Sequence, residues 1–258
     1  MFITDPGKLA RFHTKARLWQ GIPGIERTQN GRLFASLYSG STGEGNGNYS
    51  VVFLSNDGGQ TWTEPVAVAY IGEEGRCYDP GLWIDPLGRL WFYWNTYPDY
   101  VVWAAICEDP DAEALTWLPP RKIGKEVMMN KPTVVSEDCW LFPVAVWGQS
   151  VFAGNMMPSS EIERLAFVYR SSDQGETFEK LGGVSVPERA FDEHMVVSLP
   201  NNVLWMLVRT RYGIGQSFSY DGGNTWTPGE DTGFGGPDAR FFIRRLSSGR
   251  LLLINHYK

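Results

Sequence analysis

The sequence lacks the features that direct a chain to nucleic acid or into a membrane. Its 23 Lys+Arg and 29 Asp+Glu give a formal net charge of −6. This balance argues against nucleic acid as the main partner, because phosphate binding needs a basic face. No apolar run is long enough for a membrane-spanning helix, and the opening MFITDPGKLARF has no apolar signal region. We therefore expect no membrane partner, and localisation stays open with the cytoplasm as the default expectation.

Cysteine is also scarce. The three cysteines, Cys77, Cys107 and Cys139, are odd in number, and no CxxC pair occurs. Disulfide frameworks and zinc sites need paired or closer spacing, so we expect buried free thiols instead. No other metal-ligand spacing is present, and we expect neither a metal nor a cofactor.

Aromatic residues and glycine are abundant by contrast. Aromatics make up 14% of the chain, beside 29 Gly and 16 Pro. Aromatic-rich strands separated by many Gly, Pro, Asn and Asp turns are typical of an all-β protein. No segment has a convincing helical period, so we predict an all-β fold that buries aromatic runs such as Trp91–Trp94.

An eight-residue pattern, S-x-D-x-G-x-T-[W/F], occurs three times. The copies are Ser55–Trp62, Ser171–Phe178 and Ser219–Trp226. We interpret the pattern as a tight β-hairpin turn, in which the carboxylate accepts backbone N–H groups and the glycine supplies a positive φ. The aspartates of the pattern are therefore predicted to be structural. They are Asp57, Asp173 and Asp221.

A second repeat predicts the architecture. Short strands that follow a turn recur at intervals of 47 to 64 residues. Their positions are Leu33, Leu90, Trp140, Leu204 and Leu251. Each interval matches one four-stranded blade, so the chain holds about 4.5 blades of a β-propeller. We predict one domain over residues 1–258, C-terminally truncated from a six-bladed parent protein; the alternative is that Met1–Phe12 completes a fifth blade.

The eight-residue pattern resembles the Asp-box, or bacterial neuraminidase repeat, of the sialidase superfamily. The resemblance extends from Ile22 to Lys258 and includes residues 22–28, IPGIERT. That segment is similar to the Arg-Ile-Pro start of the family's first blade, with Gly21 at the arginine position. The resemblance implies a sialidase-like β-propeller and makes Arg27 a candidate substrate contact.

In a later blade the family has a glutamate and, sixteen residues further on, an arginine. Glu193 and Arg209 fit this spacing. The resemblance implies that Glu193 is the base that activates a tyrosine nucleophile, and that Arg209 belongs to an arginine triad that clamps the substrate carboxylate. The family's third arginine and its tyrosine fall beyond Lys258.

Two departures from the family pattern separate the chain from an orthodox sialidase. The first triad arginine is replaced by Gly21. The loop that carries the family's acid/base aspartate is residues 41–48 here, STGEGNGN, which has no Asp. These departures imply a sialidase-like branch that acts on another substrate.

Further candidates come from the residues themselves. Strand alternation places Arg211 on the same face as Arg209, and a pair of guanidinium groups suits a carboxylate ligand. Glu193 is followed by His194, which is a candidate catalytic partner, and His256 is a candidate substrate contact at the end of the last strand.

Polar residues also stand at the starts of several blades, where a propeller lines its ligand-binding pit. Asp79 and Asp238 are candidate acids at two of these blade starts, and Arg240 is a candidate anion contact. The alternative is that the prolines at these blade starts only mark where the strands begin.

The leading functional hypothesis is a retaining exo-glycoside hydrolase that removes a terminal acidic sugar from a glycan. Arg209 would bind the sugar carboxylate and Glu193 would act as the base. The first alternative is a uronate-specific polysaccharide lyase or hydrolase, in which His194, His256 or a tyrosine takes the C5 proton. The second alternative is a non-catalytic glycan-binding propeller. In all three the partner is a carbohydrate, and the oligomeric state stays open.

Overall fold

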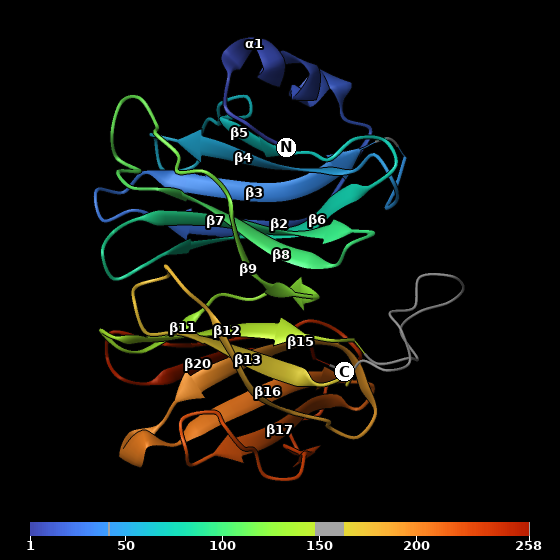
Figure 1. The fold of residues 1–258 in the computed structure, drawn as a ribbon, viewed down its shortest axis with the longest axis vertical. Coiled ribbons are helices and arrows are strands. Elements are labelled where there is room, and N and C mark those ends of the chain that lie inside the picture. The colour runs from blue at the N-terminus through green and yellow to red at the C-terminus, as the bar shows by residue number, and fades with distance from the viewer. Residues whose placement is uncertain (41, 148–162, 258) are drawn as a thin grey trace. The chain divides into compact units, whose positions relative to one another are not determined.

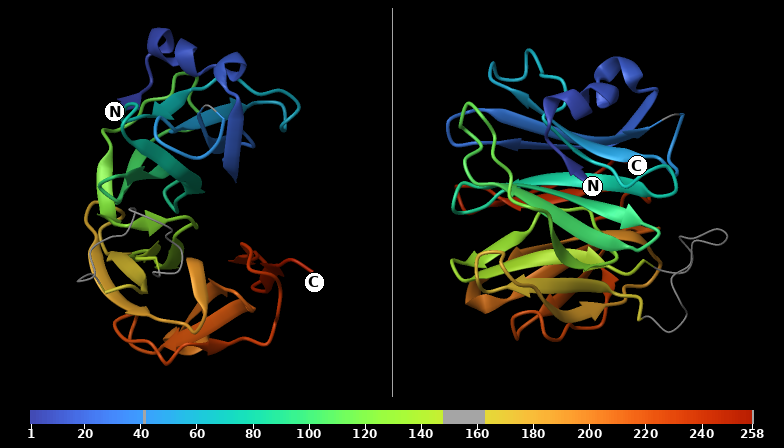
Figure 2. Two further views of the ribbon diagram at one scale, coloured as in Figure 1. Left: turned by 90° about the vertical axis from the view of Figure 1, so that its right-hand side faces the viewer. Right: turned by 45° about the horizontal axis from the view of Figure 1, so that its top comes forward.

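A computed structural model describes residues 1–40, 42–147 and 163–257, shown in several views in Figures 1 and 2. The chain divides into two compact units, Met1–Lys125 and Glu126–Lys258. Within each unit the paired strands are antiparallel, and most neighbours in a sheet are also neighbours in the chain. None of the helices in the described ranges is both long and apolar enough to cross a membrane.

The first unit contains two blades. The strands of the first blade are β2 (Trp19–Arg27), β3 (Leu33–Gly40), β4 (Tyr49–Ser55) and β5 (Ala67–Ala69). The strands of the second blade are β6 (Arg76–Ile84), β7 (Leu90–Tyr97), β8 (Val101–Cys107) and β9 (Arg121–Lys125). Both are simple meanders, which is the blade topology that the repeat intervals predict.

The N-terminal segment joins the first blade. Strand β1 (Phe2–Ile3) pairs with β5, so that Phe2 lies opposite Ala69. Three short helical turns follow: α1 (Pro6–Leu9), η1 (Ala10–Phe12) and η2 (Thr14–Ala16). Figure 2 shows this helical segment against the outer strands of the blade, where Leu9 and Phe12 pack in a core cluster with residues of β4. The alternative in which Met1–Phe12 completes a fifth blade is therefore wrong, because β1 extends the first.

The second unit contains two more blades. The strands of the third blade are β10 (Val127–Met128), β11 (Thr133–Ser136), β12 (Cys139–Ala145), β13 (Ala166–Ser171) and β14 (Glu179–Val184). Both β10 and β11 pair with β12, so its innermost strand is interrupted. The elements of the fourth blade are β15 (Arg189–Ser198), η4 (Pro200–Asn202), β16 (Leu204–Thr210), β17 (Gly213–Ser219) and β18 (Glu230–Asp231).

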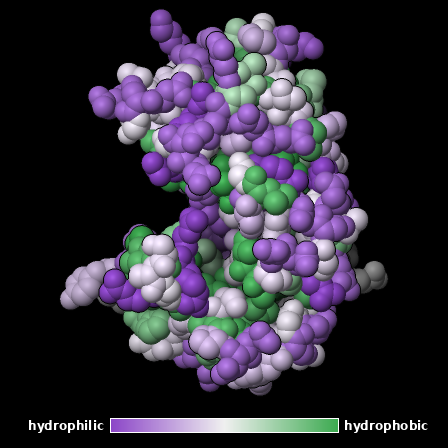
Figure 3. Space-filling model, turned by 90° about the vertical axis from the view of Figure 1, so that its left-hand side faces the viewer, coloured by the Kyte–Doolittle hydropathy of each residue, from purple (hydrophilic) through white to green (hydrophobic). Residues whose placement is uncertain are grey.

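A two-stranded sheet, β19 (Phe242–Arg245) and β20 (Leu251–Ile254), ends the described part of the chain. Leu251 and Leu253 pack inward, whereas Leu252 and Ile254 are exposed, which is the alternation of a strand with one buried face. Figure 3 shows apolar residues (green) that reach the surface among hydrophilic ones. Four blades and one hairpin confirm the predicted all-β propeller of about 4.5 blades.

The three repeated turns have the same hydrogen bonds. In each, the aspartate accepts a bond of 2.9 Å from the backbone N–H of the threonine four residues on. The serine hydroxyl accepts from the glycine N–H, and the three glycines have φ angles of 91°, 91° and 97°. An L side chain rarely adopts this φ, so the pattern needs glycine there.

Aromatic residues and thiols fill the cores. Trp91, Phe92 and Trp94 are buried, as the composition predicts. The cysteines are free thiols, and burial raises the pKa of Cys77 to about 12 and that of Cys107 to about 11. These two thiols therefore stay protonated near neutral pH.

Candidate active site

The first strand of the fourth blade carries two consecutive carboxylates in an unusual backbone. The pairing of β15 with β16 shifts register on both sides of Asp192. Asp192 and Glu193 have φ angles of 59° and 42°. Left-handed residues other than glycine are disfavoured and concentrate at functional sites, so this bulge is a backbone indication of a site.

Glu193 contacts Arg209 across the sheet. The Glu193 Oε2 atom lies 3.0 Å from Arg209 Nη1, and their side chains are 5% and 16% exposed. The guanidinium also lies over the Phe191 ring, 4.9 Å from its centroid. Burial on one side and an aromatic ring on the other restrict the guanidinium to contacts through its edges.

Asp238 holds another edge of the same guanidinium. Its Oδ1 accepts from Arg209 Nε at 2.7 Å, and its backbone oxygen accepts from Nη2 at 3.1 Å. The Asp238 side chain is 40% exposed. Arg209 is thus bridged by one buried and one solvent-facing carboxylate.

Arg240 and Asn130 complete the cluster. Arg240 Nη2 donates to the Met129 backbone oxygen at 3.0 Å and to Asn130 Oδ1 at 3.1 Å. The Asn130 amide donates to the backbone oxygens of Glu193 and His194. Asn130 lies in the gap between β10 and β11, so the interruption of that strand provides the amide that fixes the bulge.

The environment of Glu193 shifts its pKa. Burial raises the pKa of the Glu193 carboxyl above its usual value, while the charges of Arg209 and then Arg240 oppose the shift. A raised pKa makes a carboxylate a stronger base than one in water, which suits a group that takes up a proton in a reaction.

Asp192 faces the other way, into a buried ion pair. Arg189 Nε and Nη2 donate to Asp192 Oδ1 and Oδ2 at 2.7 and 2.6 Å. Arg189 also donates to the backbone oxygens of Val146 and Arg164. Burial raises the pKa of Asp192 to about 6, against the opposing charge of Arg189. This pair ties the bulge to the neighbouring blade and was not predicted from the sequence.

His194 is placed in the core and not beside the Glu193 carboxylate. The side chain is buried, and Nε2 lies 2.7 Å from the Phe167 backbone oxygen. Burial lowers the pKa of His194 to about 4, so the ring is neutral near pH 7. The structure therefore separates the His194 ring from the Glu193 carboxylate, because adjacent strand residues point to opposite faces.

Three other predicted substrate contacts are exposed at or just beyond the ends of strands. Strand β16 ends at Thr210, so Arg211 stands exposed in the following turn and does not share the face of Arg209. His256 is exposed beyond the end of β20. Arg27 is exposed at the end of β2, where that strand meets its hairpin turn.

The first unit has a comparable bulge at Asp79. This buried residue has a φ of 45°, and β6 shifts register between Tyr78 and Gly81. Strand β2 has the same feature at Ile22, with a φ of 49° and a shift between Gly21 and Gly24. Both left-handed residues directly precede a proline, and this repeated dipeptide is the signal from which the bulges could have been inferred.

The structure adds three residues to the surroundings of Asp79 that the sequence did not indicate as candidates: Tyr38, Glu44 and Arg76. Burial raises the pKa of the Tyr38 hydroxyl, and the Asp79 charge and a hydrogen bond to Glu44 add to the effect. Arg76 Nη1 lies 4.0 Å from Glu44 Oε2, and the Arg76 guanidinium lies over the Tyr78 ring at 4.3 Å. The loop without an aspartate therefore does supply a carboxylate, which is Glu44.

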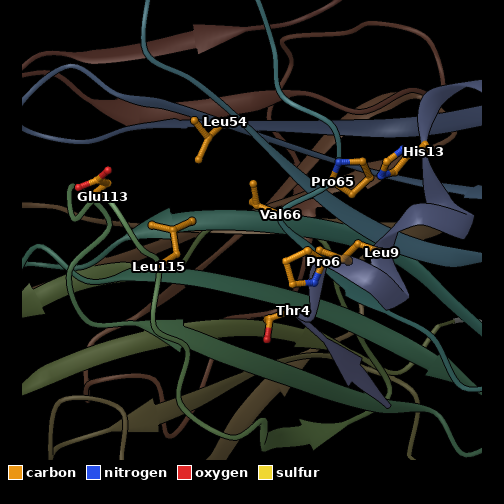
Figure 4. Close-up of a pocket in the computed structure, with 9 residues that line it drawn as sticks. All are labelled: Thr4, Pro6, Leu9, His13, Leu54, Pro65, Val66, Glu113 and Leu115. Atoms are coloured by element: carbon orange, nitrogen blue, oxygen red, sulfur yellow. The ribbon is translucent and has the colours of Figure 1, made fainter.

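A pocket of about 400 Å³ lies elsewhere in the first unit. Residues that line it include Leu9, Leu54 and Leu115, with His13 and Glu113 as the titratable members. Figure 4 shows His13 and Glu113 at opposite ends of the pocket. None of the predicted site residues lines it. Among the described residues no group of three or more His, Cys, Asp or Glu is arranged to hold a metal ion.

Fold and repeats together define the class of protein, which is a sialidase-like β-propeller built from Asp-box blades. The chain belongs to the BNR repeat-like domain family, which matches residues 31–258. The resemblance to the sialidase superfamily is thereby confirmed. No curated protein matches the sequence.

Solved structures with the same fold include proteins of several sources. A Dyadobacter fermentans protein of unknown function is 20% identical with a TM-score of 0.67, over 91% of this chain and 74% of that chain. A Hadza microbial sialidase is 17% identical with a TM-score of 0.66, over 92% of this chain and 52% of that one. A leech intramolecular trans-sialidase, solved with 2,7-anhydro-Neu5Ac, is 13% identical with a TM-score of 0.63, over 92% of this chain and 55% of that one. The chain spans about half the length of these two sialidases, and at such identities the likeness shows the fold alone.

Proposed function

We propose that this chain carries part of the active site of a glycoside hydrolase that removes a terminal acidic sugar from a glycan. The family and the fold support a glycan-processing propeller. The acidic sugar and the hydrolytic reaction are the finer part of the proposal, and they rest on the cluster around Glu193 and Arg209.

One observation carries the proposal, which is the contact of 3.0 Å between Glu193 and Arg209 at a strained bulge. Arginine binds carboxylates through paired N–H groups more specifically than lysine does. A buried glutamate beside it has the raised pKa of a group that accepts and returns a proton. Arg209 therefore orients the acidic sugar, and Glu193 moves the proton.

The test is turnover of chromogenic glycosides by the full chain. The panel contains glycosides of N-acetylneuraminic, glucuronic and galacturonic acids with their neutral counterparts. Glu193→Gln keeps the size of the side chain and removes its basicity, so we expect kcat to fall by about 10²- to 10⁴-fold. Glu188→Gln, an exposed glutamate of the same unit, is the matched control and should keep wild-type kcat.

The same assay distinguishes the other functions. A lyase would release products with a conjugated double bond, visible by ultraviolet absorbance. Its histidine bases lose support here, because His194 is buried against Phe167 and His256 stands exposed beyond the last strand. Saturable sugar binding without turnover, unchanged in Glu193→Gln, would contradict the hydrolase and identify a glycan-binding module.

A further inference from the structure

The guanidinium of Arg209 is already engaged on one of the two edges that a ligand carboxylate could use. Bidentate recognition of a carboxylate takes two N–H groups on one edge. The Nε and Nη2 groups, which form one such edge, both donate to oxygens of Asp238, at 2.7 and 3.1 Å. The Nη1 group donates to Glu193, so each nitrogen of the guanidinium already has an acceptor when a carboxylate arrives.

Of the two carboxylates on Arg209, Asp238 is the one that can leave. Glu193 is 5% exposed, whereas Asp238 is 40% exposed. Asp238 also follows a segment between β18 and β19 in which Gly233, Gly235 and Gly236 have φ angles of 74°, 66° and 118°. Glycine gives a backbone more conformational freedom than any other residue, so this segment can move more easily than the β15 bulge.

The charges of the cluster lead to the same result. Arg209 and Arg240 are balanced by Glu193 and Asp238, and Asp192 is paired separately with Arg189. A carboxylate ligand that enters while Asp238 stays in place would add a third anion to two cations. A neutral sugar adds no charge and needs no displacement.

We infer that Asp238 is a specificity-determining residue: it occupies the Nε and Nη2 edge of Arg209, so an acidic ligand makes a bidentate contact with that edge only by displacing Asp238. The inference rests on the proposed function, because it names the residue that limits binding of the acidic sugar at the proposed active site. The affinity for acidic ligands is then reduced in proportion to the fraction of molecules in which Asp238 has left Arg209. The affinity for neutral ligands is unaffected.

The test follows the Arg209 Nε–H resonance in ¹⁵N-labelled full chain, with acetate as the probe. The resonance is assigned by its loss in Arg209→Lys. Asp238→Asn keeps the shape of the side chain but removes its charge, and we expect acetate to bind at least about fivefold more tightly than to wild type. Asp138→Asn changes the net charge equally in an exposed turn of the same unit, and should bind acetate as wild type does.

Asp238→Ala is measured beside Asp238→Asn, because an asparagine can still accept from Arg209 through its amide oxygen. Equal acetate affinity in wild type and in both variants, with all spectra well dispersed, overturns the inference. The proposed function fails separately: if Asp238→Asn gains acetate affinity but no acidic glycoside is turned over by any variant, the inference stands and the hydrolase on an acidic sugar does not.

Discussion

Glu193 and His194 are neighbours in the chain, yet they lie in opposite environments. The Glu193 carboxylate meets Arg209, and the His194 ring meets the Phe167 backbone oxygen in the core. A run of polar residues at a strand start predicts a site, but it does not tell which side chain faces it. The bulge decides that. It is stabilised by Arg189, three residues before Asp192, and by Asn130, which is 63 residues before Glu193.

Replacement of His194 separates a core role from a catalytic one. We expect His194→Ala to lower the free energy of unfolding by about 2–4 kcal/mol, because it leaves a cavity and a buried carbonyl without its partner. The pH dependence of kcat between pH 5 and 8 should not change, because the pKa of about 4 keeps this ring neutral there. Urea unfolding and a pH–rate profile measure the two effects. The account would be contradicted if His194→Ala kept the wild-type free energy of unfolding but lost the acid or alkaline limb of its pH–rate profile near neutral pH.

Arg240 should set where activity begins as pH rises. The base must be ionised, so activity falls as pH drops through the pKa of Glu193, which burial raises and the Arg240 charge lowers. Removing that charge in Arg240→Gln raises the pKa further, and we expect the acid limb of kcat/KM to move up by roughly 0.5 pH unit. Arg244→Gln, an exposed arginine of β19, is the control. A limb that stays in place or moves to lower pH excludes Glu193 as the titrating base.

At the scale of elements, the turns were predictable and the bulges were not. An Asp-box uses bonds between residues at most four apart, so its eight letters determine its conformation. The bulges at Asp79 and Asp192 depend on pairing with a neighbouring strand. A local pattern marks such a position only indirectly, through the proline after Asp79 and Ile22.

The Asp-box turns should lose stability in acid. Hydrogen bonds from Thr61 and Ser55 lower the pKa of Asp57 to about 2. Since the folded-state pKa lies below the unfolded value of about 3.9, the carboxylate stabilises the fold above pH 4 and this contribution is lost as pH falls from about 4 to 2. Asp57→Asn should therefore unfold more easily than wild type at pH 7, with a difference that shrinks toward pH 3.

Denaturant unfolding at the two pH values measures this difference. Asp138→Asn removes an exposed turn carboxylate outside the repeated pattern and serves as the control. A difference between Asp57→Asn and wild type that is the same at both pH values would show that the ionised carboxylate is not what stabilises the turn.

At the scale of the whole molecule, the repeat intervals predicted the number of blades because each blade is one supersecondary unit. The intervals left open the alternative that Met1–Phe12 completes a fifth blade, because the two strand residues Phe2 and Ile3 carry too little pattern to show which edge they extend; they pair with the first blade. The fold was therefore readable from the sequence, while the partners of each side chain were not.

The repeats also predict that residues 1–258 form one domain. Blades of a repeat array bury their faces against neighbours, so we expect the two compact units to unfold together. Differential scanning calorimetry should give one transition in which the calorimetric and van't Hoff enthalpies agree. Two separable transitions would show that Met1–Lys125 and Glu126–Lys258 are independent domains.

The central claim is that Arg209 holds the acidic group of a sugar. The most direct measurement is titration calorimetry of N-acetylneuraminic, glucuronic and galacturonic acids with wild type, Arg209→Lys and Arg211→Lys. Lysine keeps the charge but loses the planar fork, so we predict that one acidic sugar binds wild type and that Arg209→Lys weakens it at least about tenfold. Arg211→Lys, in the exposed turn after β16, should stay within about twofold. Equal affinities in the two variants, or no binding of any acidic sugar to wild type, would contradict the claim.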